Sequence, residues 1–285
     1  MKSSKIQGYL LIALSAVLLG SNVIYARYLY LPSPVLNFFR YFFGSLILFV
    51  YLVKRDKKLI FPMSQKKEIV ALGIINTLLS ITAFYAFMNT SIANAEILLY
   101  SYPIYILFLA PLIIKEKIEK STVPTLILSF FGLILIAYSG NIFSGSQNLA
   151  GLVSGFVSGI LFALYVLIAK ITRNQHDGLL LNFYQLAITV IILMPFLFFL
   201  SYEISYQKII LLVIMGLINS ALALSFYFHG IKLVKAQHVG IISYLEPLSA
   251  VLYAAILFHE IPGFLTVLGG IFILYGGYRL AKVKN

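Results

Sequence analysis

Runs of roughly 20 apolar residues recur along the whole chain, and they constrain its fold more than any other feature. Ten runs are long enough to cross a bilayer core as helices, whose backbone amides are satisfied within each segment. We expect spans near residues 6–26, 34–53, 68–88, 93–114, 122–140, 150–170, 178–200, 208–230, 238–258 and 261–280. Only 11% of the 285 residues are charged, against about 25% in soluble domains. The sequence therefore predicts an all-α integral membrane protein with ten transmembrane helices.

The basic residues indicate how these helices are oriented. All but three of the 21 Lys and Arg residues fall in connections on one side of the expected membrane, the exceptions being Arg27, Arg40 and Lys208. By the positive-inside rule this side is cytoplasmic, and both termini face it in a multi-pass protein of the cell membrane. Topology thus accounts for the net charge of +12, which gives no support to nucleic-acid binding. Because the chain has no cysteine, it has neither disulfides nor thiolate metal sites.

The second half of the chain repeats the first at a shift of about 144 residues. The repeated positions keep their order, as these pairs show: Arg27 and Lys170, Asn37 and Asn182, Tyr100 and Tyr244, Pro103 and Pro247, Glu116 and Glu260. We expect one five-helix half over residues 1–141 and another over residues 148–285. Because five is odd, the second half enters the membrane from the opposite side. Such inverted repeats suit alternating access around a central site.

Two motifs are the most recognisable parts of this repeat. They are Leu99-Tyr100-Ser101-Tyr102-Pro103 with Lys115-Glu116 after it, and Tyr244-Leu245-Glu246-Pro247 with His259-Glu260 after it. In these motifs and in its paired halves, nearly the whole chain resembles the drug/metabolite transporter superfamily of the EamA type. The resemblance implies a ten-helix carrier, often an exporter of amino acids or related metabolites. It also implies that helices one to four of each half line a central cavity, while helices five and ten lie to the side. Glu96 departs from the family pattern, which usually has a small or apolar residue there.

Ionisable residues inside the spans are few, and each is costly in lipid. Arg40 lies about two turns into the second span, Glu96 about one turn into the fourth, and Glu246 near the middle of the ninth. Asn37 shares a helical face with Arg40, and a similar polar pair recurs in the seventh span. The expected transport pathway comprises Asn37, Arg40, Glu96, Tyr100, Tyr165, Asn182, Gln185, Tyr244 and Glu246, with helix kinks at Pro103 and Pro247.

Two of these residues allow two interpretations each. Arg40 can meet a carboxylate or phosphate of the cargo, because its planar guanidinium suits bidentate contact, or it can form a permanent ion pair with Glu96 or Glu246. Glu246 can bind a proton or a substrate amine, or it can brace the kink at Pro247 by a local hydrogen bond.

The predicted function is secondary transport by alternating access, most simply the export of an amino acid or a related compound. One alternative is a facilitative carrier or importer of a cationic or quaternary amine, or of a nucleotide-like metabolite. An intramembrane enzyme is another, but the sequence has no His-Glu-x-x-His, paired Asp or Ser-His arrangement and no Walker motif. We expect no cofactor and no metal. The expected partners are the lipid bilayer and a small molecule, with the protein acting as a monomer or homodimer.

Overall fold

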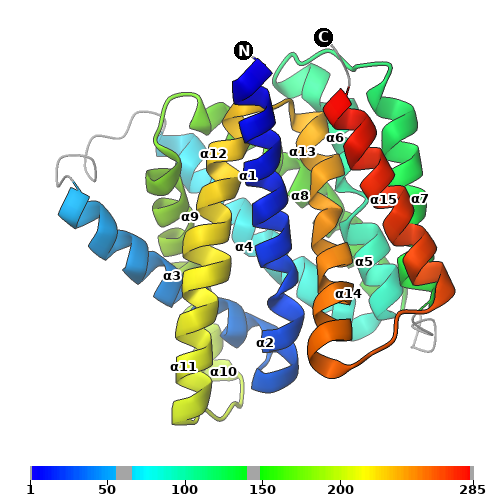
Figure 1. Ribbon diagram of the computed structural model, residues 1–285. Helices are drawn as coiled ribbons and strands as arrows, with labels where there is room; N and C mark the ends of the chain where they lie inside the picture. The colour runs from blue at the N-terminus through cyan, green and yellow to red at the C-terminus, as the bar shows by residue number, and fades with distance from the viewer. Residues whose placement is uncertain (1, 56–65, 140–147, 283–285) are drawn as a thin grey trace.

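The computed structural model describes residues 2–55, 66–139 and 148–282, and every regular element in these ranges is a helix. Figure 1 shows a bundle in which both ends of the chain lie at the same end, here called the terminus face. The helices are α1 (Lys2–Gly20), α2 (Asn22–Leu29), α3 (Ser33–Arg55), α4 (Lys66–Asn89), α5 (Ile92–Leu99), α6 (Tyr102–Ile113), α7 (Thr122–Ser139), α8 (Leu149–Arg173), α9 (Gly178–Leu193), α10 (Phe196–Phe199), α11 (Tyr206–Met215), the π-helical segment η2 (Gly216–Ala223), α12 (Leu224–Leu233), α13 (Ala236–Ser243), α14 (Leu245–Phe258) and α15 (Phe264–Lys282).

Helix length and composition agree with the expected membrane spans. Within the described residues, nine helical segments are long and apolar enough to cross a membrane. The shorter apolar helix α7 packs along α15 and completes the set of ten. The predicted all-α, ten-helix architecture is therefore confirmed. The boundary that we expect between residues 141 and 148 falls, except for residue 148, outside the described residues.

The two halves are interlocked rather than side by side. Helix α1 of the first half packs against α12 and α14 of the second, while α8 of the second half packs against α4, α5 and α6 of the first. Two ion pairs at helix ends also join the two halves. Arg27 binds Glu260, and Lys170 binds Glu116 at 3.1 Å between Nζ and Oε1. Because these residues are counterparts in the repeat, the two pairs express its inverted symmetry.

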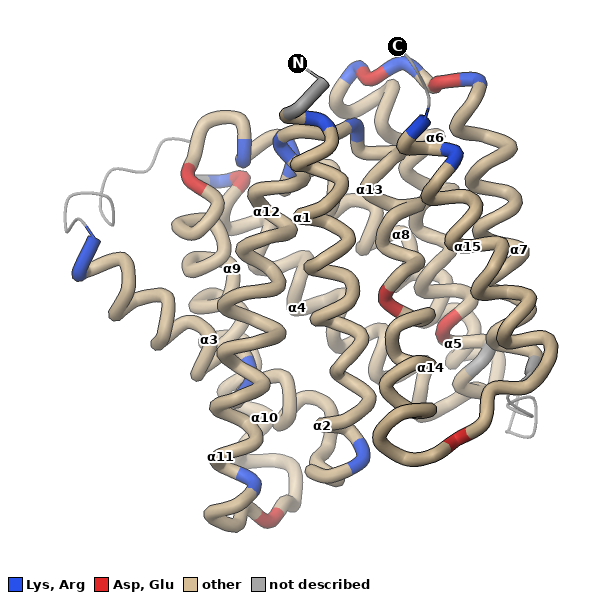
Figure 2. The backbone as a smooth tube through the Cα atoms, viewed as in Figure 1, with Lys and Arg blue, Asp and Glu red and all other residues tan. Residues whose placement is uncertain are grey.

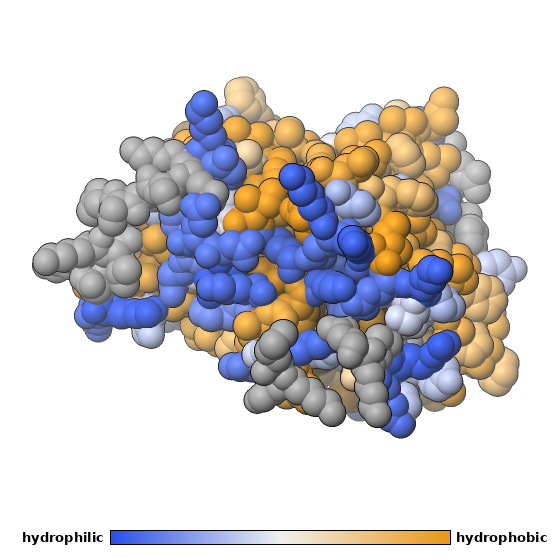
Figure 3. Space-filling model, turned by 90° about the horizontal axis from the view of Figure 1, so that it is seen from above, coloured by the Kyte–Doolittle hydropathy of each residue, from blue (hydrophilic) through white to orange (hydrophobic). Residues whose placement is uncertain are grey.

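Charge is distributed as the topology argument expects. Figure 2 shows Lys and Arg residues gathered at the terminus face and a nearly uncharged bundle interior. Seen from that face, a hydrophilic band crosses the molecule between apolar side chains (Figure 3). The apolar flanks suit contact with lipid, and the polar band suits contact with water.

Close contact between α7 and α15 depends on glycine. A methyl group at Gly269 would lie 2.3 Å from the carbonyl oxygen of Gly132 and 2.9 Å from a side-chain carbon of Ile136. A methyl group at Gly277, on the same helix, would meet nothing within 4 Å. The glycines of α15 thus serve packing within the monomer at Gly269.

We expect Gly269→Ala to destabilise the protein by about 1–3 kcal/mol, because backbone atoms must move apart to admit the methyl group. Gly277→Ala is the matched control and should be neutral or stabilising by up to about 1 kcal/mol, since it only removes glycine's backbone freedom. Thermal unfolding of the two purified variants in detergent measures the difference. Equal midpoints for both variants would contradict the packing described here.

Candidate functional site

A cavity of about 500 Å³ lies within the bundle, in the half remote from the terminus face. Helix α3 begins at that remote end, and its first turns, from Ser33 to Tyr41, contribute to the lining. The middle of α8 and the start of α14 also contribute to the lining. Its polar and ionisable lining residues are Asn22, Ser33, Asn37, Arg40, Tyr41, Asn76, Ser80, Glu96, Tyr100, Tyr165 and Glu246.

Arg40 enters this cavity without a carboxylate partner. The described residues contain no ion pair between Arg40 and either Glu96 or Glu246. Instead, Nη1 donates to Oδ1 of Asn22 at 3.3 Å and Nη2 donates to the hydroxyl of Tyr41 at 3.1 Å. Nε is buried and has no partner among the described residues. In this conformation Arg40 makes no ion pair within 4.0 Å among the described residues, and both hydrogen bonds of its guanidinium go to neutral groups.

The two carboxylates come from helices that are broken at the same place in each half. The fourth span is interrupted between α5 and α6 at Tyr100, and the ninth between α13 and α14 at Tyr244. Each break lies three residues before a proline, whose missing N–H leaves an upstream carbonyl unpaired. The two tyrosines meet, because the hydroxyl of Tyr244 donates to the backbone oxygen of Tyr100 at 3.0 Å.

Glu246 is brought beside the first span by a close helix contact. A methyl group at Gly20 would lie 2.7 Å from the carbonyl oxygen of Glu246 and 2.0 Å from Oγ of Ser249. That same Oγ donates to the Glu246 carbonyl at 2.9 Å. One local hydrogen bond near Pro247 is made by a serine and a backbone oxygen, and Glu246 lines the cavity together with Tyr100 and Arg40.

The remaining predicted residues divide into two groups. Asn37, Tyr100, Tyr165 and Pro247 line the cavity together with the three charged residues, whereas Asn182, Gln185, Tyr244 and Pro103 lie outside its lining.

Asn182 and Gln185 are fully buried behind the cavity. Tyr165 donates to Oε1 of Gln185 at 2.8 Å, Gln185 donates to Asn182 at 3.1 Å, and Asn182 donates to the backbone oxygen of Ser220 at 2.8 Å. In this conformation the polar pair of the second half is sealed, while its counterpart in the first half, Asn37 and Arg40, meets the cavity.

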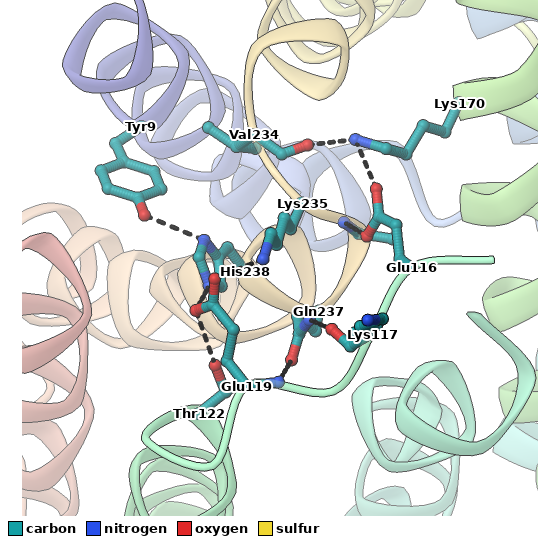
Figure 4. A network of polar contacts seen from close by, with 11 residues as sticks. Tyr9, Glu116, Lys117, Glu119, Thr122, Lys170, Val234, Lys235, Gln237 and His238 are labelled. Atoms are coloured by element: carbon teal, nitrogen blue, oxygen red, sulfur yellow. Dashed lines mark hydrogen bonds and ion pairs between the residues drawn. The ribbon is translucent and has the colours of Figure 1, made fainter. Parts of the chain in front are cut away.

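The terminus face is closed by a polar network between the two halves, shown in Figure 4. Glu119, in the connection between α6 and α7, binds Lys235 at 2.6 Å and Nε2 of His238 at 2.8 Å. The hydroxyl of Tyr9 lies 2.9 Å from the other ring nitrogen of His238. Gln237 donates to the backbone oxygen of Lys117 at 3.0 Å. These contacts, with the Lys170–Glu116 pair, are called the terminus-face network below.

Its central carboxylate is charged at neutral pH. Burial raises the pKa of Glu119, but hydrogen bonds from Lys235 and His238 outweigh this and hold the pKa below its ordinary value. A carboxyl whose pKa is lowered in the closed form stabilises that form at higher pH and loses this contribution as pH falls through the lowered pKa. The contribution of Glu119 to the network is therefore present at neutral pH and is lost in acid.

Comparison with known proteins assigns the chain to a family. The sequence profile of the EamA-like transporter family matches it twice, at residues 6–138 and 149–280. The chain belongs to the EamA-like transporter family. This confirms the resemblance seen in the sequence, and it means that the cavity described above belongs to a membrane transporter and not to an enzyme.

Relatives of this EamA-like transporter span nearly its whole length. An uncharacterized transporter from Archaeoglobus fulgidus is 28% identical over 265 residues, covering 93% of each chain. A protein from Rickettsia conorii named as an S-adenosylmethionine uptake transporter is 24% identical and covers 92% of this chain and 87% of its own. A solved crystal structure superimposes with a TM-score of 0.79 at 14% identity, covering 98% of this chain and 96% of its own, which shows a shared fold.

The contacts of several polar residues in this EamA-like transporter could not be predicted from its sequence. Asn22 and Asn219 are polar residues in apolar spans. Such residues bridge helices for about 0.6 kcal/mol on average, which favours a purely structural role. Glu119, Lys235 and His238 lie near helix ends, where charge is expected from topology alone. The clustered acids and bases of residues 115–120 were the available signal that this connection binds another segment.

Proposed function

We propose that this transporter carries a small zwitterionic metabolite, an amino acid or a related compound, by alternating access. The supporting observation is that Arg40, without a carboxylate partner, shares one cavity with Glu96 and Glu246. A cargo carboxylate would neutralise the guanidinium, and a cargo ammonium group would neutralise one of the acids. A cavity of about 500 Å³ is within the usual range of small-molecule sites, roughly 300–1,000 Å³.

The proposed direction is export, and it rests on the family resemblance together with the expected cytoplasmic position of the termini. With that orientation, the described conformation has its cavity on the outer side of the membrane and its cytoplasmic side closed. For an exporter this is the conformation that releases cargo. Return to the cytoplasmic-open form then requires the terminus-face network to separate.

A second candidate is a cargo with net positive charge. Two carboxylates and one guanidinium line the cavity, so a ligand with two cationic groups and one anionic group would balance all three. S-adenosylmethionine, the compound in the name of the Rickettsia conorii relative, has an ammonium, a sulfonium and a carboxylate group. Under this alternative the protein acts as an importer of a nucleotide-like metabolite.

Purified protein in liposomes tests both candidates. The vesicles are loaded with single unlabelled compounds, and entry of the same labelled compound is followed with and without a proton gradient. The panel holds zwitterionic amino acids, cationic amino acids, S-adenosylmethionine and the amide of each amino acid.

We expect saturable exchange of at least one compound that has both a carboxylate and an ammonium group, and exchange of its amide weaker by at least about tenfold, because the amide offers no anion to Arg40. Exchange confined to S-adenosylmethionine would favour the second candidate. Equal exchange of acid and amide, or no exchange across the panel, would contradict the zwitterion proposal.

A further inference from the structure

The eighth span is wound as a π-helix where it faces α3 between Arg40 and Gly44. The π-helical segment η2 packs so closely on α3 that a methyl group at Gly216 would lie 3.1 Å from the backbone oxygen of Arg40, and one at Gly44 would lie 2.5 Å from Cβ of Ser220. π-Helical turns are rare and are frequently found at functional sites. This segment lies directly against the backbone that presents Arg40.

Asn219, within η2, is fully buried and joins the eighth span to the break in the first span. Its Nδ2 lies 3.0 Å from the backbone oxygen of Leu18, 3.1 Å from Oγ of Ser21 and 3.0 Å from Oδ1 of Asn22. The break between α1 and α2 at Ser21 is thus held by a side chain from the other half of the protein.

Asn22 connects this contact to the cavity. Its Oδ1 accepts from Asn219 and also from Nη1 of Arg40, at 3.3 Å. A carboxamide oxygen between two donors has its orientation fixed, since a flip of the amide would set an NH2 group against both donors. Asn219 therefore determines which way Asn22 presents its oxygen to the guanidinium.

We propose that Asn219 is a positioning residue that acts through Asn22 to hold the Arg40 guanidinium ready for the carboxylate of the cargo. The inference rests on the proposed function, because it assigns the anionic end of a zwitterion to Arg40. With Nη1 and Nη2 bound to Asn22 and Tyr41, the guanidinium is held in place without an ion pair to a carboxylate. A cargo carboxylate then meets a guanidinium whose side-chain freedom has already been lost, which favours binding.

Asn219→Leu tests the inference, because leucine keeps the side-chain volume and removes the hydrogen bonds to Asn22. The readout is the ratio of affinities of the purified protein for L-alanine and L-alaninamide, measured by calorimetry in detergent. We expect the wild-type ratio to favour L-alanine and to fall about three- to tenfold in Asn219→Leu, the effect of losing about one hydrogen bond at Arg40. Arg40→Ala should abolish the preference, and Asn219→Gln should retain part of it.

Thr189→Val is the matched control. Thr189 is equally buried and its hydroxyl accepts a hydrogen bond from Asn76 at 3.1 Å, and its other hydrogen bonds go to the backbone oxygens of Gly73 and Gln185, not to Asn22 or Arg40. It should lower the thermal unfolding midpoint as Asn219→Leu does, without changing the ratio. If the wild-type ratio is large and Arg40→Ala abolishes it while Asn219→Leu leaves it unchanged, the positioning role is wrong and the proposed function stands. If wild-type protein does not prefer the acid, both are wrong.

Discussion

Replacing Arg40 with alanine is expected to weaken transport by at least about 30-fold, the effect of removing one partner of a desolvated, hydrogen-bonded charge pair. The guanidinium is the only basic group among the described residues that line the cavity. Without it, the charged side chains in the described cavity lining would be those of Glu96 and Glu246, and their negative charge would repel a cargo carboxylate. Initial rates of exchange in liposomes, at equal amounts of inserted protein, measure the effect.

Two variants separate charge from geometry at this position. Arg40→Lys keeps the charge but loses the planar fork, so an intermediate rate is expected. Arg55→Ala is the matched control: it removes an arginine from the other end of the same helix, where the side chain is 45% exposed and pairs with Asp177 at 3.7 Å. Such an exposed pair contributes roughly 0–1 kcal/mol, so transport should be close to wild type. Wild-type rates of exchange by Arg40→Ala would show that Arg40 does not bind the cargo.

Cross-linking the terminus-face network is expected to stop transport completely and reversibly. Because the chain has no cysteine, Glu119→Cys and Lys235→Cys introduce the only two thiols. A bifunctional methanethiosulfonate reagent can then join the two connections whose native side chains meet at 2.6 Å. Transport should fall to the level of empty liposomes, because the terminus face can no longer open, and a reductant should restore it.

The single variants, treated with the same reagent, serve as controls and should keep their own untreated rates. The opposite face has the Arg27–Glu260 pair, the counterpart of Lys170–Glu116, but among the described residues it has no counterpart of the ion pairs of Glu119 with Lys235 and His238. A shift of 144 residues places Ser91, Asn94 and Gly263 at the positions of Lys235, His238 and Glu119. Undiminished transport by a protein that mass spectrometry shows to be fully cross-linked would mean that this face does not open during transport.

The fold was predictable because a membrane leaves few choices. Backbone amides in lipid must be satisfied within helices, so ten apolar runs predict ten spans. The repeat added the inverted arrangement, and the Arg27–Glu260 and Lys170–Glu116 ion pairs lie where its counterparts place them. The interruptions of the spans were less visible. Pro103 and Pro247 indicated two of them, while the break at Ser21 and the π-helix around Asn219 depend on contacts between helices that composition does not reveal.

The three charged residues of the site could also be predicted from the sequence, because of the energetic cost of the membrane environment. Charge inside a span is costly, so Arg40, Glu96 and Glu246 stand out, and all three line the cavity. Asn182 could not be placed in the same way. Its counterpart Asn37 meets the cavity while Asn182 is buried, because a single conformation of an inverted repeat opens one half toward a face and closes the other. The sequence repeat places Asn37 and Asn182 at equivalent positions, so it cannot predict which of them meets the cavity in a given conformation.

Side-specific labelling of Ala83→Cys, a lone thiol on the cavity wall in a chain otherwise free of cysteine, tests the alternating-access account most directly. Without cargo, a membrane-impermeant maleimide should reach this thiol from the face opposite the termini and not from the terminus face. During exchange of a transported compound, labelling should occur from either face. Labelling from the terminus face without cargo, or none from that face during active exchange, would contradict the account.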